Sequence, residues 1–274
     1  MTKITIIGCG YVGTAIARYW ERLGFSVTVT TTTPEKVKTL KSVSSKVAVV
    51  QGNDPISLES VIKDAEIVLL SVGAKGGNSY VETYLETAKT LVSVLEKVSS
   101  VKQLIYTSSY SVYGDRQGGE VDENSPVSPV TDQAKILIET EQIIQSAVNS
   151  SHRVCILRLG GIYGEERELI KIFGRVAGTV RPGNGKEVTN WIHLEDIVSA
   201  IEFARQQQLS GIYNLVDDAH ITTGELFQRL FETHNLPPIT WDSSQKSLRP
   251  YNVTVSNQKI KDAGYSLIHP QMQF

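Results

Sequence analysis

Three glycines near the start of the chain are spaced as in turns that bind the phosphates of a dinucleotide. Gly8, Gly10 and Gly13 come after the strand-like run 4–7, which contains three isoleucines, and apolar residues at helical spacing begin among them. We therefore expect a strand, a turn and a helix. The first glycine permits a sharp turn, the second lets backbone N–H groups approach a pyrophosphate, and the third lets the helix pack closely on the strand. The helix N-terminus adds unpaired N–H donors and a positive dipole end. The predicted phosphate contacts are Gly8, Gly10, Tyr11, Val12 and Gly13.

Two other interpretations of this turn need weighing. A glycine-rich turn between a strand and a helix also occurs where no ligand binds, and that alternative stays open. Methyltransferases use a related turn, but they usually carry an acidic residue at the end of the preceding strand. This strand ends with Ile6 and Ile7, so we favour a dinucleotide.

The end of the second expected strand bears on which dinucleotide binds. NAD sites usually carry Asp or Glu about twenty residues after the glycines, where the carboxylate binds the ribose 2′-OH, and NADP sites cannot tolerate that charge. Here residues 30–33 are four threonines, and the first carboxylate is Glu35. Threonine hydroxyls can donate to a 2′-phosphate, and Lys36 and Lys38 lie nearby in the sequence. We therefore favour NADP over NAD, although a β-branched strand end followed by a threonine cap explains the same residues.

The rest of the chain must position these residues at one edge of a sheet. Strand-like runs alternate with amphipathic helical patterns, which predicts parallel βαβ units. After the opening strand, we expect strands at residues 25–30, 46–52, 65–73 and 101–109, at the start of 152–164, and at 211–216. We expect helices at residues 34–42, 57–64, 80–98, 133–148, 196–208 and 222–236, besides the opening one. The loops after parallel strands share one carboxyl edge, where ligands bind.

The predicted fold class is α/β, a Rossmann-type doubly wound parallel sheet with a smaller C-terminal substrate lobe. We assign residues 1–161 and 192–217 to the NAD(P)-binding core and residues 162–191 and 218–274 to the smaller lobe. The remaining cofactor contacts are expected at the ends of the strands: Thr30, Thr31, Thr32, Asn53, Asp54, Ser71, Val72, Gly73 and Thr107.

Three later stretches resemble the signatures of one enzyme family. They are YTSSYSVYGD (106–115), LRLGGIYG (157–164) and WIHLEDIVSAI (191–201). Together with GCGYVG (8–13), they resemble the extended and atypical short-chain dehydrogenase/reductases, the NAD-dependent epimerase/dehydratase group, from residue 4 to about residue 217. The form of the glycine turn and the stretch SPVTDQAK are most similar to the atypical branch. The resemblance implies an oxidoreductase or epimerase that acts on a sugar-nucleotide-like or small carbonyl substrate.

The resemblance also implies catalytic residues, one of which this sequence lacks. Ser109 stands where the family places the hydroxyl that polarises the substrate oxygen, although a strand-end serine that bonds local backbone explains it equally well. The family's acid/base is a Tyr four residues before a Lys whose charge lowers the phenol pKa. Lys135 matches that lysine, either as a ribose contact or as a solvated helix lysine, but Thr131 stands in place of the tyrosine. An aliphatic hydroxyl is a poor acid or base at neutral pH, so the usual chemistry is in doubt.

The predicted substrate contacts come from the same signatures. Arg158 and Arg167 could grip a carboxylate or phosphate. Tyr113 or Tyr110 could supply a phenol, and the alternative is that they pack beside the nicotinamide. In the family, the element that contains His193 is mainly structural, and there Asp196 is expected to cap the following helix. The predicted substrate-binding set is Tyr113, Arg158, Tyr163, Arg167 and His193.

Composition excludes several partner classes. The formal net charge is −2 over 274 residues, without a Lys/Arg block, so nucleic acid and anionic membranes are not expected partners. No run approaches the roughly 18 apolar residues that span a bilayer. Cys9 and Cys155 lack the spacing of metal ligands, so we expect no metal site. Two buried free thiols fit a reducing compartment, so we expect a cytoplasmic protein. Its expected oligomeric state is a monomer or a homodimer. The alternatives to an enzyme are a non-catalytic NAD(P)-binding module that senses redox state, and a scaffold without a cofactor.

Overall fold

The computed structural model describes residues 1–74, 79–149 and 151–274. The chain folds into two compact units. Unit 1 comprises Met1–Ser108, Lys135–Arg158 and Val198–Tyr213, and unit 2 comprises Ser109–Ala134, Leu159–Ile197 and Asn214–Phe274. The chain passes repeatedly between them, so neither unit is one continuous segment.

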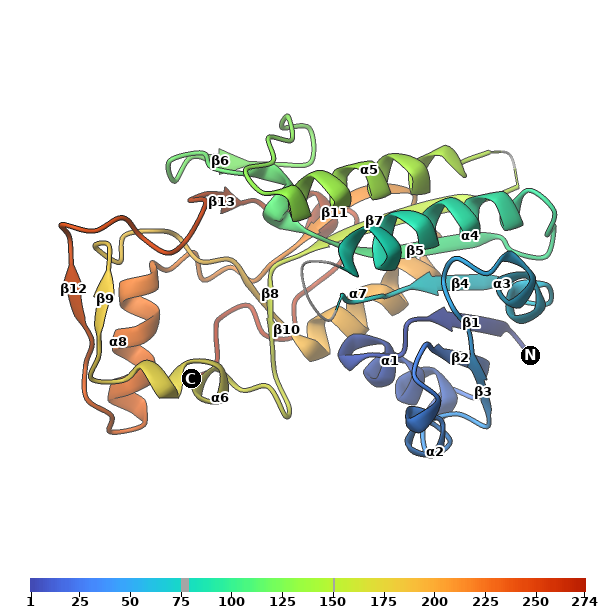
Figure 1. Ribbon diagram of the computed structural model, residues 1–274, viewed down its shortest axis with the longest axis horizontal. Helices are drawn as coiled ribbons and strands as arrows, with labels where there is room; N and C mark the ends of the chain where they lie inside the picture. Colours follow the sequence, from blue (N-terminus) through green and yellow to red (C-terminus); the bar gives the residue numbers. More distant parts are fainter. Residues whose placement is uncertain (75–78, 150) are drawn as a thin grey trace. The chain divides into compact units, whose positions relative to one another are not determined.

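Unit 1 is built on a seven-stranded sheet with the order β11-β7-β5-β4-β1-β2-β3 (Figure 1). The strands are β1 (Lys3–Ile7), β2 (Ser26–Thr31), β3 (Lys46–Val49), β4 (Ile67–Leu70), β5 (Gln103–Ser109), β7 (Arg153–Leu159) and β11 (Gly211–Leu215). The pairs β1–β2, β1–β4, β2–β3 and β4–β5 are parallel. This order, with the chain reversing direction beside β1, is that of a Rossmann-type sheet. The predicted fold class is therefore confirmed.

Helices cover both faces of this sheet. They are α1 (Tyr11–Arg22), η1 (Pro34–Lys36), α2 (Val37–Leu40), α3 (Pro55–Ile62), η3 (Val81–Glu86), α4 (Thr87–Leu95), α5 (Asp132–Ser146) and α7 (Leu194–Gln206). On one face, side chains of α3, α4 and α5 share a hydrophobic core with the strands. On the other face α1 and α7 meet where Trp20 Nε1 donates to Glu202 Oε2 at 2.7 Å. Because both faces are covered, all four residues of β4 are buried.

Two predicted helices differ from the observed ones. The helix expected at residues 80–98 starts with the wider turns of η3 before α4 begins, and the Thr87 hydroxyl bonds the Glu82 carbonyl within that stretch. The helix expected at 57–64 begins at Pro55, because Asp54 and not Ser57 caps it. The Asp54 carboxylate accepts the backbone N–H groups of Ile56 and Ser57.

Unit 2 consists of short strand pairs and helices around its own core. Its elements are η4 (Tyr110–Tyr113), β6 (Glu120–Val121), β8 (Gly161–Tyr163), α6 (Leu169–Phe173), η5 (Gly174–Val176), β9 (Val180–Pro182), β10 (Trp191–His193), α8 (Thr223–Thr233), β12 (Thr240–Asp242), β13 (Thr254–Val255) and α9 (Gln258–Asp262). The parallel pairs are β8–β10, β9–β12 and β6–β13. The hydrophobic face of α8 supplies Leu226, Phe227, Leu230 and Phe231 to the core. A capping box between Thr222 and Glu225 starts this helix.

The observed units divide the chain differently from the predicted core and lobe. Residues 109–134 were placed in the core by their position between two strands of the large sheet. In the structure they belong to unit 2, because β6 pairs with β13 and the Asn252 carbonyl accepts the N–H groups of Arg116 and Gly118. The first and last thirds of unit 2 are thus joined by contacts between residues far apart in the sequence.

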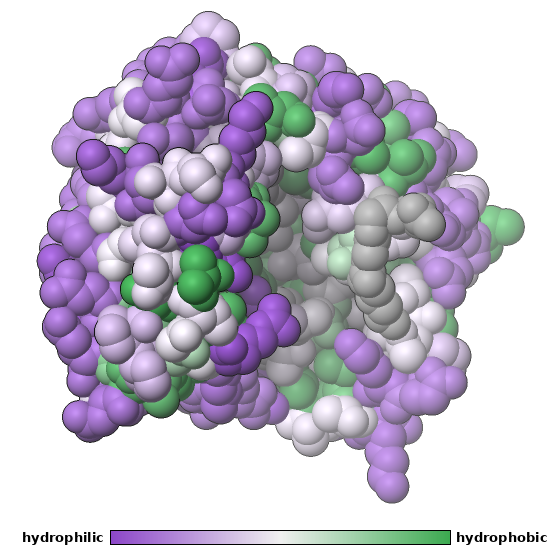
Figure 2. Space-filling model, turned by 60° about the vertical axis from the view of Figure 1, so that its left-hand side comes forward, coloured by the Kyte–Doolittle hydropathy of each residue, from purple (hydrophilic) through white to green (hydrophobic). Residues whose placement is uncertain are grey.

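The surface of the protein, its helices and its two cysteines can be compared with what the sequence predicted. On the face drawn in Figure 2, hydrophilic residues cover most of the surface and hydrophobic residues form small separate patches. Among the described residues, every helix is too short or too polar to cross a lipid bilayer. Cys9 and Cys155 are buried and form no disulfide, as the sequence predicted.

Candidate functional site

The glycine turn of unit 1 has the geometry that its spacing predicted. Gly8 has φ +91°, and a Cβ on it would lie 2.6 Å from the Ser71 carbonyl oxygen. A Cβ on Gly13 would lie 2.4 Å from the Gly8 carbonyl oxygen, so this position must be glycine for α1 to pack against the turn. No atom of the described residues lies within 4 Å of the Cβ position of Gly10. The space beside Gly10 is therefore open for a ligand to approach the backbone.

The N-terminus of α1 presents its backbone donors beside this turn. Among the residues that the structure describes, no side chain caps the helix at Gly10, and the first turn carries no acidic residue. The N–H groups of a helix start and its positive dipole end favour an anion there. The turn fits a phosphate-binding role, since it combines close backbone approach with an absence of nearby negative charge in the first turn.

A cleft of about 290 Å³ opens at the turn within unit 1. The predicted cofactor residues that line it are Gly8, Gly10, Thr30, Thr31, Thr32, Ser71, Val72 and Gly73. Lys36 lines it as well and is exposed. The carboxyl ends of β1, β2 and β4 thus meet at one cleft, as expected for a parallel sheet.

Other predicted cofactor residues support the cleft without lining it. Tyr11, Val12 and Gly13 form the first turn of α1. Thr107 donates its hydroxyl to Ser71 Oγ at 3.1 Å, and Asp54 caps α3. Asn53 is exposed, and the cleft is lined instead by Gln51 and Gly52. The shift arises because β3 ends at Val49, earlier than predicted.

The threonines at the end of β2 make different contacts. The Thr30 hydroxyl accepts the Gly8 N–H at 3.2 Å and so holds the glycine turn. The Thr31 hydroxyl accepts the Thr33 N–H at 3.1 Å. Thr32 is exposed at the cleft. The cleft is thus lined at the end of β2 by threonine hydroxyls and the Lys36 ammonium group. The carboxylate that lines the cleft belongs to Glu82, which is not part of β2.

Unit 2 contains a second, larger pocket of about 420 Å³. Its aromatic walls are Phe173, Trp191, Phe227 and Trp241. Glycines make room for the two indoles, because a Cβ on Gly161 would lie 2.7 Å from the Trp191 ring and a Cβ on Gly185 would lie 2.6 Å from the Trp241 ring. The chain has three tryptophans, and two of them form this pocket.

Charged and hydroxyl groups line the same pocket. Arg249 donates from Nη2 to the Tyr110 hydroxyl at 3.0 Å and from Nη1 to the Thr223 hydroxyl at 3.3 Å. Arg181 also lines the pocket. Glu187 Oε2 is buried and, within the described part of the chain, has no hydrogen-bond partner. The pocket can therefore receive both a flat apolar group and a group that carries negative charge.

The structure gives the predicted catalytic residues local roles as well. Ser109 lines the unit 2 pocket, and its hydroxyl accepts the Ser111 N–H at 3.2 Å at the start of η4. Thr131 Oγ1 accepts the Ala134 N–H at 3.1 Å, just before α5 begins at Asp132. Lys135 lies in the first turn of α5 and is exposed. The Thr131 hydroxyl thus serves the helix start, where threonine is a good cap.

Two predicted substrate tyrosines are buried in the framework of unit 2. Tyr113 donates its hydroxyl to Asn214 Oδ1 at 2.8 Å. The Tyr163 hydroxyl accepts the Gln273 N–H at 3.2 Å, and burial raises its pKa to about 12. Neither lines the unit 2 pocket, whose two phenols are Tyr110 and Tyr251.

The other predicted substrate residues also lie outside that pocket. Arg158 is buried in unit 1, where it binds both carboxylate oxygens of Glu141, and Ser108 donates to the same carboxylate at 2.6 Å. Arg167 donates from Nε to the Ile162 carbonyl at 3.0 Å. His193 packs edge-on against Tyr163 with ring centroids 5.1 Å apart. The sequence motifs that contain Arg158, Arg167 and His193 do not show that these side chains contact other residues of the protein.

Several pocket residues had no motif to identify them. Trp241 and Arg249 lie in the C-terminal part of the chain, where the periodicity is weak. Trp241 reaches the pocket because β12 pairs with β9, which sets it opposite Arg181. Their residue types alone could have indicated a binding role, since tryptophan and arginine are enriched at binding surfaces.

Most of the chain is similar to one known protein family. The model of the "NAD dependent epimerase/dehydratase family" matches residues 4–215. Protein YeeZ of Escherichia coli K12 is 30% identical over 253 residues, which are 90% of this chain and 89% of YeeZ.

Two solved structures illustrate the shared fold. MoeE5 in complex with UDP-glucuronic acid and NAD has a TM-score of 0.81 and 17% identity, covering 97% of this chain and 93% of MoeE5. The human epimerase family protein SDR39U1 with NADPH has a TM-score of 0.79 and 17% identity, covering 98% and 96%. At this identity the likeness establishes the fold alone. The family match over most of the chain and the glycine-lined cleft together show that this protein belongs to the NAD-dependent epimerase/dehydratase family.

Proposed function

We propose that this protein is an NADP(H)-dependent oxidoreductase or epimerase that acts on a sugar nucleotide. The observation that carries the proposal is the glycine-lined cleft of unit 1, in which an open Gly10 faces a ligand space while Gly8 and Gly13 leave no room for a Cβ. The cofactor supplies the site that accepts or returns a hydride. The chain's own residues must bind and orient the two ligands and move the accompanying proton.

The lining of the cleft supports NADP over NAD. Thr31, Thr32 and Thr33 offer hydroxyls at the end of β2, and Lys36 adds a positive charge beside them. A ribose 2′-phosphate is stabilised by such donors and is repelled by the carboxylate that NAD sites place there. Among the solved structures with this fold, SDR39U1 was solved with NADPH and MoeE5 with NAD.

The unit 2 pocket supports a sugar nucleotide as the substrate. Trp191, Phe227 and Trp241 offer flat faces to a nucleobase. Arg181 and Arg249 are suited to the diphosphate, because guanidinium groups bind phosphate oxygens in pairs. The unpartnered Glu187 oxygen can accept a sugar hydroxyl. MoeE5, the relative with the same fold, was solved with UDP-glucuronic acid. A small carbonyl compound remains the alternative substrate.

We assign the proton transfer to Tyr110 instead of Thr131. A phenol loses its proton several pH units below an aliphatic hydroxyl, so it is the better acid and base. Tyr110 lines the same pocket as Ser109, and Arg249 fixes its hydroxyl with a hydrogen bond. In this scheme Ser109 orients the substrate oxygen, and Tyr110 gives or takes the proton at that oxygen.

Binding and turnover measurements test the proposal. The purified protein should quench or shift NADPH fluorescence at lower concentration than NADH, and it should turn over at least one member of a UDP- and dTDP-sugar panel. A parallel panel of small aldehydes and ketones tests the alternative substrate. Failure to bind either nucleotide would overturn the cofactor assignment and leave a scaffold without a cofactor.

The hydrogen bond of Thr131 favours a second candidate, a non-catalytic NADP(H)-binding module that reports redox state. Its hydroxyl is engaged at the start of α5, and the family's catalytic phenol is missing. This candidate predicts tight NADPH binding without turnover on either panel, and unchanged cofactor affinity in Ser109→Ala. A large loss of native turnover in Ser109→Ala would exclude it.

A further inference from the structure

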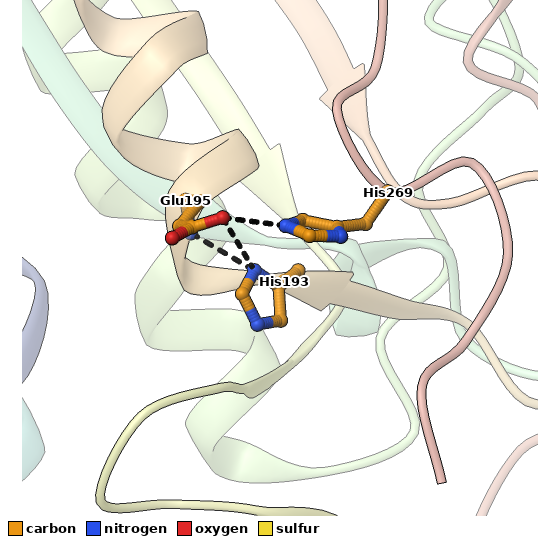
Figure 3. A group of neighbouring side chains, drawn as sticks. All are labelled: His193, Glu195 and His269. Carbon is orange, nitrogen blue, oxygen red and sulfur yellow. Dashed lines mark hydrogen bonds and ion pairs between the residues drawn. The ribbon is translucent and has the colours of Figure 1, made fainter.

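The C-terminal segment places a histidine beside two possible metal ligands in unit 2 (Figure 3). His193 ends β10, Glu195 lies in the first turn of α7, and His269 follows 74 residues after Glu195. His269 Nε2 lies 2.6 Å from Glu195 Oε2, and His193 Nδ1 lies 4.0 Å from the same oxygen. The two imidazole ring centroids are 4.0 Å apart. Two imidazoles and a carboxylate from three positions in the sequence therefore converge on one point.

We propose that His193, Glu195 and His269 bind a divalent transition-metal cation, for which Zn²⁺ is the best match. Two imidazole nitrogens and one carboxylate oxygen, with a water in the fourth position, are a recurrent Zn²⁺ donor set. At Zn–ligand distances of about 2.1 Å, donor atoms on a tetrahedral ion lie about 3.4 Å apart. The distances of 2.6 and 4.0 Å lie on either side of that spacing. Rotation of the Glu195 side chain, which is 64% exposed, can adjust both.

The backbone around His269 is held in place by residues that are not ligands. The carboxylate of Asp196, which is fully buried, accepts the N–H groups of Ile268 and His269 at 2.6 and 3.0 Å. Further along, the Gln273 N–H donates to the Tyr163 hydroxyl. These bonds replace the helix cap that the sequence predicted for Asp196. They fix the segment against α7 and β8 on both sides of His269, so little ordering is required when a cation binds.

The two imidazoles are also oriented by their neighbours. The His193 ring packs against Tyr163, and its Nδ1 accepts the Glu195 N–H at a long 3.3 Å. The bound cation takes the lone pair that this weak hydrogen bond now uses. His269 Nδ1 lies 2.7 Å from the side-chain amide of Gln273. A histidine that binds a metal through Nε2 carries its proton on Nδ1 and donates it to an acceptor. With a cation bound, the Gln273 amide would therefore turn its oxygen to His269 Nδ1, and the ring would keep Nε2 directed at Glu195.

Charge supports a cation at this point. Glu195 provides a full negative charge in the first turn of α7, and the buried carboxylate of Asp196 lies beside it in the sequence. His269 Nε2 and Glu195 Oε2 lie at hydrogen-bond distance, and a bound cation would take the place of the proton between them. The site then joins the C-terminal segment to β10 and α7 through coordinate bonds, so occupancy should stabilise unit 2 by mass action.

Direct metal binding tests the proposal without cofactor or substrate. Tag-free protein, dialysed against EDTA and then against buffer, is titrated with ZnSO₄ in a calorimeter. We expect one cation per chain with a dissociation constant of about 1 μM or tighter, and an increase in the thermal unfolding temperature. Co²⁺ in place of Zn²⁺ should give the visible absorption of a low-coordinate complex.

Three variants separate this site from adventitious binding. His269→Ala and Glu195→Gln should each weaken Zn²⁺ binding at least about tenfold and abolish the thermal shift. His234→Ala is the matched control, because His234 is an exposed histidine at the end of α8, and it should bind as the unchanged protein does. Unfolding curves without metal establish that each variant is folded. Absence of saturable binding below about 100 μM, or equal affinity in His269→Ala, would overturn the proposal.

Discussion

The Arg249 guanidinium donates a hydrogen bond to the Tyr110 hydroxyl, with 3.0 Å between Nη2 and Oη. Both residues line the aromatic pocket of unit 2, which Ser109 also lines. Tyr251 is the second phenol of that pocket and packs edge-on against Tyr110, with ring centroids 5.6 Å apart. One of two neighbouring phenols is thus held by a guanidinium group, in the pocket where we propose that the proton transfer takes place.

Tyr110→Phe should therefore lower kcat on the order of 100-fold while leaving NADPH affinity unchanged, since loss of a general acid or base typically costs 10²–10⁴ in rate. The phenylalanine keeps the ring and removes the hydroxyl alone. Steady-state kinetics on the best sugar nucleotide measure the effect. Tyr251→Phe is the matched control and should stay within about threefold of the unchanged enzyme. The assignment to Tyr110 fails if the two variants lose activity equally.

Two glycines of the opening turn should respond to alanine in opposite ways. Gly10→Ala adds a methyl group at a point that has no atom of the described part of the chain within 4 Å, so the fold should tolerate it while the methyl fills the phosphate cradle. Gly13→Ala places the methyl 2.4 Å from the Gly8 carbonyl oxygen and should destabilise unit 1. We expect NADPH affinity to fall at least about tenfold in Gly10→Ala without a change in urea unfolding, and the free energy of unfolding to fall by about 1–3 kcal/mol in Gly13→Ala. Equal cofactor affinity in Gly10→Ala and the unchanged protein would contradict the cradle.

The exposed end of β2 should decide between the two cofactors. Thr32→Asp places a carboxylate at the cleft, where it repels a 2′-phosphate and can bind a ribose 2′-OH. The ratio of the NADPH and NADH dissociation constants, measured by fluorescence titration, should shift toward NADH by about tenfold or more. Lys36→Ala should weaken NADPH alone, whereas Lys38→Ala, outside the cleft lining, is the matched control. An unchanged ratio in Thr32→Asp would mean that the 2′-position lies elsewhere.

The fold was predictable because its signals are local. The alternation of apolar runs and amphipathic segments predicted all seven strands of the large sheet. The pairing of β6 with β13 was not predictable, because each strand has two residues and they lie more than a hundred positions apart. That pairing is what moves residues 109–134 out of the predicted core.

The candidate site was predictable where backbone geometry dictates the residue type. Gly8 and Gly13 have no room for a Cβ, so glycine at these two positions indicates the turn directly from the sequence. Arg158 was predicted to bind substrate, but its guanidinium group binds the Glu141 carboxylate. Glu141 lies on α5, 17 residues away, so the sequence did not show this pairing. Trp241 and Arg249 reach the unit 2 pocket through tertiary contacts, which no spacing in the sequence reveals.

Asp217 should make stability depend on pH. Burial, with a smaller contribution from the neighbouring Asp218, raises its pKa from 3.8 to about 7. The side chain is 2% exposed, and Oδ2 has no hydrogen-bond partner among the described residues. A carboxyl whose pKa is raised by folding stabilises the protein fully below its unfolded pKa. That contribution is lost as the pH rises through the pKa of the folded state, here between about pH 4 and pH 7.

Asp217→Asn should therefore remove this loss of stability between pH 4 and pH 7, since an amide does not ionise. Each pKa unit corresponds to about 1.4 kcal/mol, so the variant should be more stable than the unchanged protein at pH 8 by up to about 4 kcal/mol. Urea unfolding at pH 4.5, 6 and 8 measures both slopes. Asp64→Asn, at a carboxylate that is 71% exposed, is the control and should follow the unchanged protein. If Asp217→Asn keeps the same slope as the unchanged protein, the buried carboxyl is not the group that titrates over this range.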